Sequence, residues 1–381
     1  MSKANKAIKY RIYPTAEQQN LFSRTFGCSR FVYNQMLALS KDAYAQGENL
    51  CSRNKFNYLL TDLKKTYLWL SEVDSTALTS ANDALASAFK NFFAKKAKFP
   101  KFHKKKYSAS YTTKHIQGSN NIEIGSNFVK LPKAGIVKAV IHRLPQDDWK
   151  LKSATISRTS DGKYYASVLF EFEKPESNYV ADLNNAIGLD YASNGLYVDS
   201  NGKVGSNHKY YRESHKKLAK EQRRLSRKIG SKKNEPKSKN YLKQLKKVGK
   251  IHRHIANQRL DILHKISTEI ANQYDVVCVE SLNMRAMSNK KFKNGKATLD
   301  NGYGMFLSLL EYKLNDRNKY FIKIDKWYPS SQICHNCGTL HPEMKDLNNR
   351  KLTCDCGLAI NRDYNAAINI KNEGLRILLS A

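Results

Sequence analysis

The chain has 381 residues, a length suited to two or three domains of roughly 150 residues each. It carries 66 Lys and Arg against 33 Asp and Glu, so its formal net charge is +33. A small anionic metabolite does not call for that excess, whereas a polyphosphate backbone or an anionic membrane does. No apolar run approaches the ~18 residues of a transmembrane helix, and the start has no signal-peptide core. We therefore expect a cytoplasmic protein whose partner is nucleic acid and not a membrane.

The first hundred residues combine one strand with a helical region. Ala7–Tyr13 alternates apolar and polar residues, which predicts a strand, and Thr15 with Gln18 forms a capping box that starts a helix. Apolar residues then recur at helical spacing to about residue 93, and core packing explains them. Thr76 and Ser80 share a polar helix face. A solvated face is the ordinary interpretation, and a DNA contact is the alternative.

A cationic run follows at Lys95–Lys106, interleaved with Phe99 and Phe102. A charge run alone usually marks a solvated surface. Aromatic residues within it, in a chain of this net charge, favour a segment that follows phosphates and stacks on bases. The candidate contacts are Lys101, Lys104 and Lys105.

Residues 107 to 174 change character and predict a small antiparallel sheet or barrel. Ile136–Arg143 and Tyr164–Phe172 alternate, and Ser160–Lys163 reads as a turn between strands. We expect the first strand of the chain to join this sheet across the helical insert. Pro175–Asn178 is the expected linker to the next region.

The last two hundred residues alternate strands and helices. The expected strands are Ala186–Asp190, Leu196–Asp199, Val276–Glu280 and Phe321–Ile324, with turns at Asn194-Gly195 and Asn201-Gly202. A basic helical stretch from about Tyr211 to Asn272, broken at Gly230–Pro236, predicts two antiparallel helices. Asn283–Asn301 reads as a loose, basic segment. On the basic helices, the candidate nucleic-acid contacts are Arg223, Arg224 and Arg253.

Four of the seven cysteines fall in one window, Cys334-x2-Cys337 and Cys354-x-Cys356. Two such pairs predict a zinc ribbon. Because four protein ligands leave no coordination position for water, we expect the Zn²⁺ to be structural. The usual second pair has two intervening residues. This departure leaves His335 or His341 as a possible substitute ligand. Without an export signal, a disulfide framework is disfavoured.

Three acidic residues stand at the edges of separate predicted elements. Asp190 and Glu280 each end an apolar strand, and Asp363 opens the last helix. Any one of them reads as a helix cap or an ion-pair partner. Together they suggest a cluster, in which the carboxylates repel one another unless divalent cations lie between them. Two Mg²⁺ ions in such a cluster suit phosphodiester hydrolysis. Spacing alone does not show that the three meet.

Several motifs, in order along the whole chain, resemble TnpB, the family of transposon-encoded RNA-guided nucleases ancestral to type V CRISPR effectors. The matching stretches are Lys6–Gln19, Lys98–Lys105, Gly188–Asp190, His254–Arg259, Val276–Asn283, Tyr328–Ser331 and Arg362–Asn369. The resemblance places Asp190, Glu280 and Asp363 on the family's three catalytic acids. Arg362 and Asn365 become candidate supporting or phosphate contacts.

The resemblance also implies a multidomain α+β architecture. Residues 1–13 and 107–180 would form a β-barrel wedge domain, and residues 14–106 a helical recognition domain inserted in it. Residues 181–381 would form a RuvC nuclease domain of RNase H-like α/β fold. That domain would carry a helical hairpin at about 211–272 and an inserted zinc ribbon at about 328–358.

The implied activity is Mg²⁺-dependent cleavage of double-stranded DNA, directed by a noncoding guide RNA from the end of the element. Base pairing reads the target, and the protein reads only a short flanking DNA motif. The resemblance implies a bacterial protein that associates with the nucleoid on DNA, and it implies no protein oligomer.

Three alternatives remain. A guided repressor without cleavage is disfavoured because domesticated relatives of that kind lose acids, and all three are present. A DNA-joining transposase with a nucleophilic Tyr lacks its paired-His metal motif here, since His252-Arg-His254 lies in a basic helical stretch. A structural zinc-ribbon DNA binder is the third.

Overall fold

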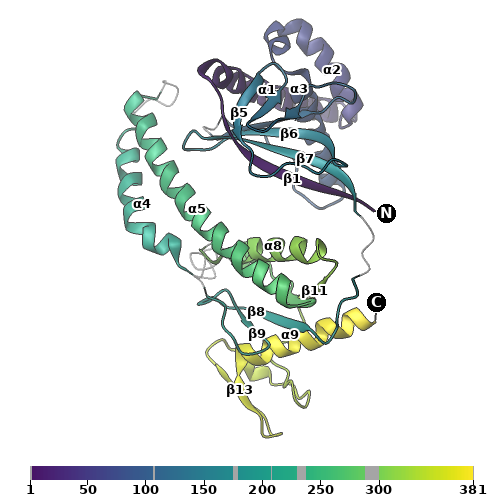
Figure 1. The fold of residues 1–381 in the computed structure, drawn as a ribbon, viewed down its shortest axis with the longest axis vertical. Coiled ribbons are helices and arrows are strands. Elements are labelled where there is room, and N and C mark those ends of the chain that lie inside the picture. Colours follow the sequence, from purple (N-terminus) through teal and green to yellow (C-terminus); the bar gives the residue numbers. More distant parts are fainter. Residues whose placement is uncertain are drawn as a thin grey trace. The chain divides into compact units, whose positions relative to one another are not determined.

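The structure is a computed structural model that describes residues 2–105, 108–174, 179–206, 208–229, 237–287 and 300–380. The chain divides into two compact units (Figure 1). The first is Met1–Glu176 with Leu245–Gly249, and the second is Ser177–Gln244 with Lys250–Ala381. The expected linker at 175–178 and the expected helix break at 230–236 lie outside the described residues, as does most of the segment 283–301.

The helical part of the first unit begins where the capping box predicts. Helix α1 (Ala16–Ala45) starts after Thr15, whose side chain accepts from the Gln18 N–H while the Gln18 side chain accepts from the Thr15 N–H. The helices bury one apolar cluster that includes Met36, Leu60 and Leu85. The remaining helices of this unit are α2 (Arg53–Thr66), η1 (Leu68–Glu72) and α3 (Ser75–Phe93).

A seven-stranded antiparallel sheet completes the first unit. Its strands are β1 (Ser2–Tyr13), β2 (Ala109–Lys114), β3 (Glu123–Ile124), β4 (Phe128–Leu131), β5 (Gly135–Val140), β6 (Lys150–Arg158) and β7 (Tyr164–Lys174). The order is β2-β6-β7-β1-β5-β4-β3. Strand β1 therefore lies between β7 and β5, which confirms that the first strand joins the sheet across the helical insert.

Of the two expected forms, a small antiparallel sheet or a barrel, the pairing order of the described strands shows an open sheet and not the β-barrel that the resemblance implies. Strands β2 and β3 are the two edges of the sheet, and no pairing joins them among the described strands. Strand β3 has only two residues, which is too short a ladder to close the sheet. Closure is unnecessary for the core, because Phe22 and Phe26 of α1 pack into the same apolar cluster as Tyr10 and Ile12 of β1.

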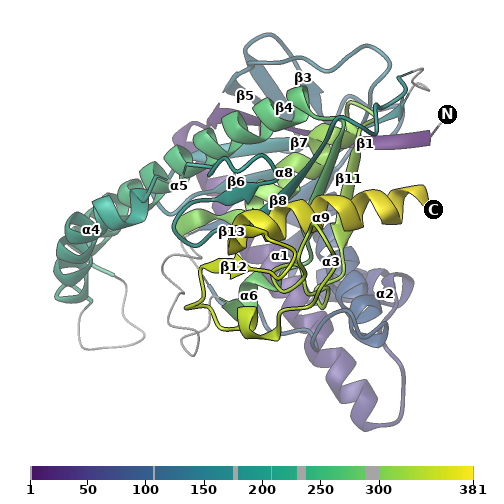
Figure 2. The ribbon, with the colours of Figure 1, turned by 90° about the horizontal axis from the view of Figure 1, so that it is seen from below.

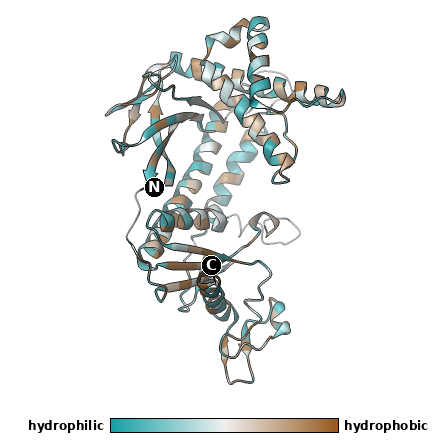
Figure 3. Ribbon diagram, turned by 90° about the vertical axis from the view of Figure 1, so that its right-hand side faces the viewer, coloured by the Kyte–Doolittle hydropathy of each residue, from teal (hydrophilic) through white to brown (hydrophobic). Residues whose placement is uncertain are grey.

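The second unit is built on a mixed sheet of four strands, ordered β11-β10-β8-β9. Strands β8, β10 and β11 are parallel, and β9 is antiparallel to β8. Four consecutive residues of β10 are buried, and Figure 3 shows these strands as mostly hydrophobic, as expected for a sheet covered on both faces. The expected strands are confirmed as β8 (Ala186–Tyr191), β9 (Tyr197–Asp199), β10 (Val276–Glu280) and β11 (Tyr320–Ile324).

The basic stretch forms the two helices that its pattern predicts, α4 (Tyr210–Ser226) and α5 (Lys239–Gln273). They are joined by the Gln244 side chain, which donates to the Glu221 backbone carbonyl at 3.1 Å and to its carboxylate at 2.6 Å. None of the described helices is long and apolar enough to cross a membrane.

A further helix, α8 (Tyr303–Asn315), has no counterpart in our sequence analysis. Phe306, Leu310 and Leu314 recur every four residues and are fully buried, which is the signal that would have found it. Lys313 is buried as well, and its ammonium donates to three oxygens of α5 at 2.6 to 2.7 Å. These bonds hold α8 against α5.

The last helix, α9 (Arg362–Leu379), packs on β8, β10 and β11 (Figure 2). Two glycines allow this contact. A Cβ on Gly188 of β8 would lie 2.1 Å from the Ala367 carbonyl oxygen, and one on Gly374 of α9 would lie 2.3 Å from the Cys278 sulfur. The helix therefore approaches the sheet more closely than any residue with a side chain at those points permits.

We predict that Gly188→Ala destabilises the protein by about 1–3 kcal/mol, because the added methyl meets helix backbone that has no rotamer to relieve the overlap. Denaturant unfolding followed by circular dichroism measures this loss. Gly27→Ala is the matched control. No atom lies within 4 Å of a Cβ at Gly27, in the middle of α1, so this substitution should raise stability by about 0.5–1 kcal/mol. Equal effects of the two substitutions would contradict the close approach of α9.

Candidate metal centre and acidic site

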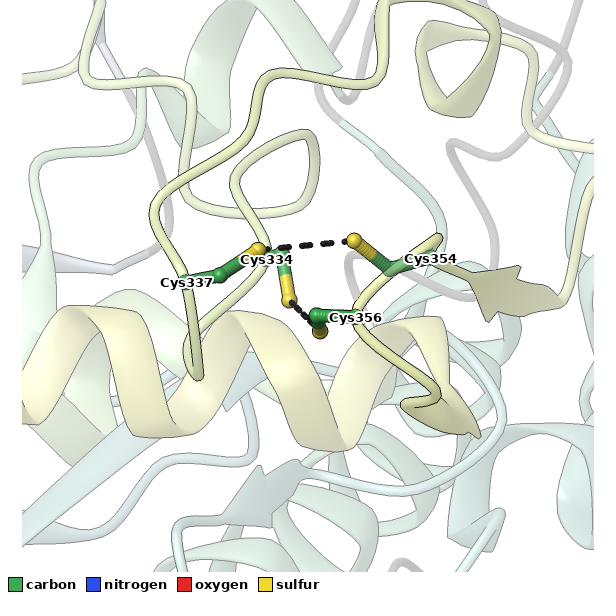
Figure 4. Close-up of side chains that lie close together, drawn as sticks. All are labelled: Cys334, Cys337, Cys354 and Cys356. Carbon is green, nitrogen blue, oxygen red and sulfur yellow. Dashed lines mark hydrogen bonds between the residues drawn. The ribbon is translucent and has the colours of Figure 1, made fainter.

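Four cysteine sulfurs converge at the end of the second unit (Figure 4). The ligand atoms of Cys334, Cys337, Cys354 and Cys356 all lie within 4.8 Å of one another. The sulfurs of Cys334 and Cys356 are 3.7 Å apart, and those of Cys337 and Cys354 are 3.5 Å apart. A tetrahedral ion with bonds of ~2.3 Å has ligand sulfurs about 3.8 Å apart. The donor set and its spacing therefore fit one zinc ion.

Local backbone geometry places the four sulfurs. Gly338 and Gly357 follow the first and second cysteine pairs with φ of 80° and 87°, which lets each knuckle turn back on itself. Their N–H groups donate to the carbonyls of Cys334 and Cys354. The short strands β12 (Lys351–Thr353) and β13 (Ala359–Asn361) pair around the second knuckle. The single residue between Cys354 and Cys356 is thus compatible with a four-sulfur group.

Neither histidine belongs to the cysteine group. The Nδ1 of His335 lies 3.0 Å from the Asn365 side-chain oxygen, and the Nδ1 of His341 lies 3.0 Å from a Glu343 oxygen. The alternative of a histidine substitute ligand therefore finds no support.

The surroundings of two of the four cysteines favour the thiolate, whereas at Cys354 the Cys356 N–H is outweighed by burial and by hydrogen bonds to the neighbouring sulfurs, which raise the pKa of Cys354 to about 12. Hydrogen bonds from the side chain and backbone of Thr339 lower the pKa of Cys337 to about 6. The Asn336 amide and the Leu358 N–H likewise lower the pKa of Cys356. Because thiolates are the form that binds metal, these donors prepare the site for a cation at neutral pH.

Two asparagines join the metal centre to α9. The Asn365 amide donates to the Ile333 carbonyl at 2.7 Å, and its oxygen accepts from the His335 N–H at 3.1 Å. The Asn369 amide donates to the carbonyls of Ser330 and Ile333 at 2.8 and 2.6 Å. Asn365 is fully buried and bonded to the ribbon, which favours the supporting role among the two that we expected for it, a supporting or a phosphate contact. Its hydrogen-bonding groups face the segment that leads into the first knuckle.

We predict one zinc per chain, measured by mass spectrometry of the acid-digested protein. Cys337→Ser should reduce zinc to near zero, because three sulfur ligands hold the ion far less well than four. Cys51→Ser should retain one zinc per chain, since Cys51 is a half-buried thiol of the helical region, far along the chain from the cysteine window. Full zinc content in Cys337→Ser would show that the four sulfurs are not the ligands.

The parallel pairing of β8 and β10 brings two of the predicted acids to one edge of the sheet. Leu189 pairs with Val279, so Asp190 and Glu280 are the next residues in register. Asp363 arrives from α9, where Asn361 caps the helix by accepting from the N–H groups of Asp363 and Tyr364. Three elements distant in sequence therefore place one carboxylate each in the same region.

The charges of Asp363 and Glu280 influence the ionisation of Asp190. Burial raises the pKa of Asp190 well above its ordinary value, and the charges of Asp363 and Glu280 raise it further. The guanidinium of Arg362 acts in the opposite direction. Burial also raises the pKa of Glu280 to about 7. Acids that oppose one another's ionisation in this way are stabilised by a divalent cation.

The acids are more widely spaced than the cysteines. Among the described residues, only the cysteine group brings three or more ligand atoms within 4.8 Å of one another. Two cavities lie beside the acids, one of about 530 Å³ lined by Glu280 and one of about 440 Å³ lined by Asp363.

The other candidate contacts divide between the two units. Ser80 lines a cavity of about 530 Å³ between α1, α3 and the 102–104 segment, and its hydroxyl has no hydrogen-bond partner in the described part of the chain. The Thr76 hydroxyl instead bonds Asp74, Thr113 and the Lys114 N–H, which ties α3 to β2. Of the lysines, Lys104 lines the Ser80 cavity, whereas Lys101 and Lys105 are exposed without lining it.

The aromatic residues of the cationic run lie against α1. His103 stacks on Tyr33 with ring centroids 3.9 Å apart, and the Asn34 side chain pairs with the His103 backbone. The ammonium of Lys41 lies 4.7 Å from the Phe102 ring, which is about half exposed. The segment is therefore held in place while its lysines remain at the surface.

The arginines of the second unit lie on the basic helices. Arg223 and Arg224 are exposed in the last turn of α4, where Arg224 donates to Glu221 at 2.8 Å. Arg253 is half-buried on α5. Arg362 lies beside Asp190, and two of its guanidinium nitrogens, Nε and Nη1, are buried without a partner in the described residues.

Sequence reasoning missed Tyr303, which interacts electrostatically with both Asp190 and Glu280. It lies just after the segment that we expected to be loose. Asp300 and Asn301, at the end of that segment, are in fact buried. The Asp300 carboxylate accepts from the N–H groups of Tyr211 and Arg212. These bonds hold the residues that lead into α8 against the first turn of α4. The buried apolar spacing of α8 was the available signal.

We predict that the metal-free protein becomes more stable as the pH falls from about 8 to about 6. The pKa of Glu280 is about 7 in the folded chain against an ordinary 4.5, so the penalty for its buried charge exists above pH 7 and disappears as the folded protein takes up a proton. The raised pKa of Asp190 acts with the same sign. Thermal unfolding measures the trend.

Glu280→Gln should reduce that pH dependence, because the amide does not ionise. Glu269→Gln is the control, since Glu269 is exposed on α5 and should leave the slope unchanged. An unchanged slope in Glu280→Gln would show that this carboxyl does not titrate near neutrality.

Together, the two units and their sites define a multidomain α+β protein with a four-cysteine centre beside an acidic α/β domain. Three sequence families match parts of the chain. Residues 1–49 match one described as "Helix-turn-helix domain", residues 168–291 one described as "Probable transposase", and residues 303–370 one described as "Cas12f1-like, TNB domain".

Two relatives match nearly the whole chain. A Streptomyces pristinaespiralis protein named "Putative RNA-guided DNA endonuclease" is 36% identical, over 98% of this chain and 90% of its own. An Escherichia coli K12 protein of the same name, InsQ, is 30% identical, over 98% of this chain and 93% of its own. The chain therefore belongs to the TnpB family, as its motifs indicate.

The fold has a counterpart among solved structures. The protein of a Cas12f1–sgRNA–target DNA complex superposes with a TM-score of 0.58 at 15% identity, over 97% of this chain and 99% of that one. At this identity the likeness concerns the fold.

Proposed function

We propose that the protein is an RNA-guided DNA endonuclease that cleaves double-stranded DNA at a RuvC-type site. The observation that carries the proposal is the meeting of Asp190, Glu280 and Asp363 at one edge of the mixed sheet, each from a different element. The names of the two whole-chain relatives, and the guided complex to which the fold is similar, support the same function.

The three carboxylates fit Mg²⁺, because Asp190 is half-buried beside two other acids. The guanidiniums of Arg362 near Asp190 and of Arg350, 3.8 Å from Asp363, leave negative charge in excess at the site. Asp190 and Asp363 would hold the ions, and Glu280 would complete one coordination shell. Two bound Mg²⁺ ions activate water and stabilise the leaving 3′-oxygen of a phosphodiester. The chain's own part is to fix the carboxylates, through the β8–β10 register and the cap at Asn361, and to supply the Arg362 guanidinium beside Asp190.

In this proposal the first unit comprises the wedge and recognition domains. Residues 1–13 and 107–180 form the wedge and residues 14–106 the recognition domain, and together they read the flanking DNA motif. The Ser80 cavity suits that role, because it brings an unpartnered hydroxyl together with Arg30 and Lys104. A groove of this size lined by hydroxyls and cations provides donors for base edges and phosphates.

Residues 181–381 form the RuvC domain, in which the ribbon at about 328–358 holds a structural zinc. The helices within 211–272 present Arg223, Arg224 and Arg253, which we assign to the backbone of the guide RNA–DNA hybrid. Binding should therefore weaken with salt as phosphate contacts are screened. We place the activity on DNA in the bacterial cytoplasm and nucleoid.

A guided repressor without cleavage is the second candidate, and it would use the same nucleic-acid surfaces. The raised pKa values of Asp190 and Glu280 favour cleavage, because a protein that only binds DNA has no need to hold carboxylates where their ionisation is opposed. The DNA-joining transposase has no comparable support from the described residues.

Asp190→Ala should abolish Mg²⁺-dependent cutting of a target plasmid while leaving guide RNA and target binding within about twofold of wild type. The guide is obtained by sequencing the RNA that copurifies with the protein. Asp261→Asn is the control, because Asp261 is an exposed acid of α5 paired with Lys265 and should cut normally.

Two results would overturn parts of this proposal. A variant Asp190→Ala that still cuts shows that the acids are misassigned. A wild-type protein that binds its RNA and its target but never cuts selects the repressor.

A further inference from the structure

Tyr303 carries a buried hydroxyl with no partner. Its side chain is fully buried at the start of α8, and its phenol oxygen makes no hydrogen bond within the described residues. Buried polar atoms are almost always bonded, so an exception indicates an absent water, an ion or a functional role. A phenylalanine would fill the same space without this penalty.

The position of Tyr303 is fixed from both sides. Its ring lies edge-to-face on Tyr191, the residue after Asp190, with centroids 5.0 Å apart, and it packs against Phe306 at 5.9 Å. The preceding Asn301 amide donates to the carbonyls of Ala192 and Gly195 at 3.1 and 2.9 Å. The start of α8 is thereby held against the loop that follows β8, so the hydroxyl is not displaced into solvent.

The hydroxyl lies within the electrostatic influence of the acidic site. Burial raises the pKa of Tyr303 well above its ordinary value, and the charges of Asp190 and Glu280 raise it further. The phenol is therefore protonated at neutral pH and acts as a donor. The phenol makes no direct hydrogen bond to those carboxylates, so a bridging water is the contact through which it would reach them.

We propose that Tyr303 is a positioning residue of the acidic site, whose hydroxyl donates through a bridging water to the carboxylates of Asp190 and Glu280. The inference rests on the proposed function, since it takes these two carboxylates to be metal ligands. The donor fixes the orientation of the carboxylates and thereby strengthens their hold on a divalent cation. Groups in this outer position affect metal affinity by roughly 10–100-fold.

Two opposite expectations for Tyr303→Phe make the proposal testable. The variant keeps the ring contacts with Tyr191 and Phe306 and removes only the unpartnered oxygen. If the hydroxyl has no role, metal binding is unchanged. If it positions the carboxylates, metal affinity falls while the metal-free protein is as stable as wild type or more so, because an unmet hydrogen bond has been removed.

The experiment is a Mn²⁺ titration of the zinc-loaded full-length protein, followed by electron paramagnetic resonance, with thermal unfolding of each variant without Mn²⁺. We expect Tyr303→Phe to raise the Mn²⁺ dissociation constant roughly tenfold without lowering the melting temperature. Tyr197→Phe is the matched control. Tyr197 is a buried tyrosine that stacks on Phe306 at 5.7 Å, and the nearby acids are Asp199 and Glu269. Its Mn²⁺ affinity should equal that of wild type.

Three results would overturn the inference. The first is an unchanged Mn²⁺ affinity in Tyr303→Phe. The second is a loss of affinity accompanied by a lower melting temperature, which indicates a packing role. The third is Mn²⁺ binding that Asp190→Ala does not alter, which also removes the acidic site from the proposed function. The first two results leave the proposed function intact, so the two failures are distinguishable.

Discussion

The close approach of α9 to the β8–β10 sheet is the contact on which the candidate site depends. Gly188 and Gly374 remove the side chains that would hold the helix away, and the helix backbone then lies against the strand that ends in Asp190. Because Asp363 is the second residue of α9, the depth at which the helix packs sets the distance between two of the three acids. Backbone contact is stiffer than contact through flexible side chains, so this distance is well defined.

The same helix also carries the metal centre. Asn365 and Asn369 hold the chain leading into the first cysteine pair, and Asp363 lies two residues before Asn365. A zinc ion that folds the ribbon therefore stabilises the groups that these asparagines bind. The ribbon and the acidic site are joined by the first turn of α9. A structural zinc ion can therefore affect the position of the acidic residues without taking part in their chemistry.

The acidic site itself is electrostatically strained in the absence of cations. Asp190 is half-buried beside two acids, while Arg362 and Tyr303, which interact with it electrostatically, include atoms without a partner in the described part of the chain. Such an arrangement is poor for stability and suitable for binding cations, because charge that is uncompensated in the protein is compensated by the ligand. The strain is confined to the edge of the sheet, and the strands beneath it are packed with fully buried apolar residues.

The sequence alone determined the local structure and the identity of the reactive groups. Alternation predicted β1, β5 and β7, and short apolar runs predicted the strands of the mixed sheet. The capping box predicted the start of α1 and the cysteine pairs predicted the four-sulfur group, because each of these signals lies within a few residues of chain. Strands β2, β3, β4 and β6 were not singled out from the sequence. Helix α8 was not predicted, because a short glycine-containing segment at its start interrupts the helical pattern that its buried apolar residues form every four positions. Alternation left a sheet or a barrel open, and the family resemblance implied a β-barrel. The described strands form an open sheet, since alternation reports which face is buried and says nothing about closure. Only the tertiary structure decided that Asn365 faces the ribbon, that Tyr303 interacts electrostatically with the acids, and that Asp190, Glu280 and Asp363 share one region. Those facts depend on register and helix packing between segments up to about 170 residues apart, and no local pattern encodes them.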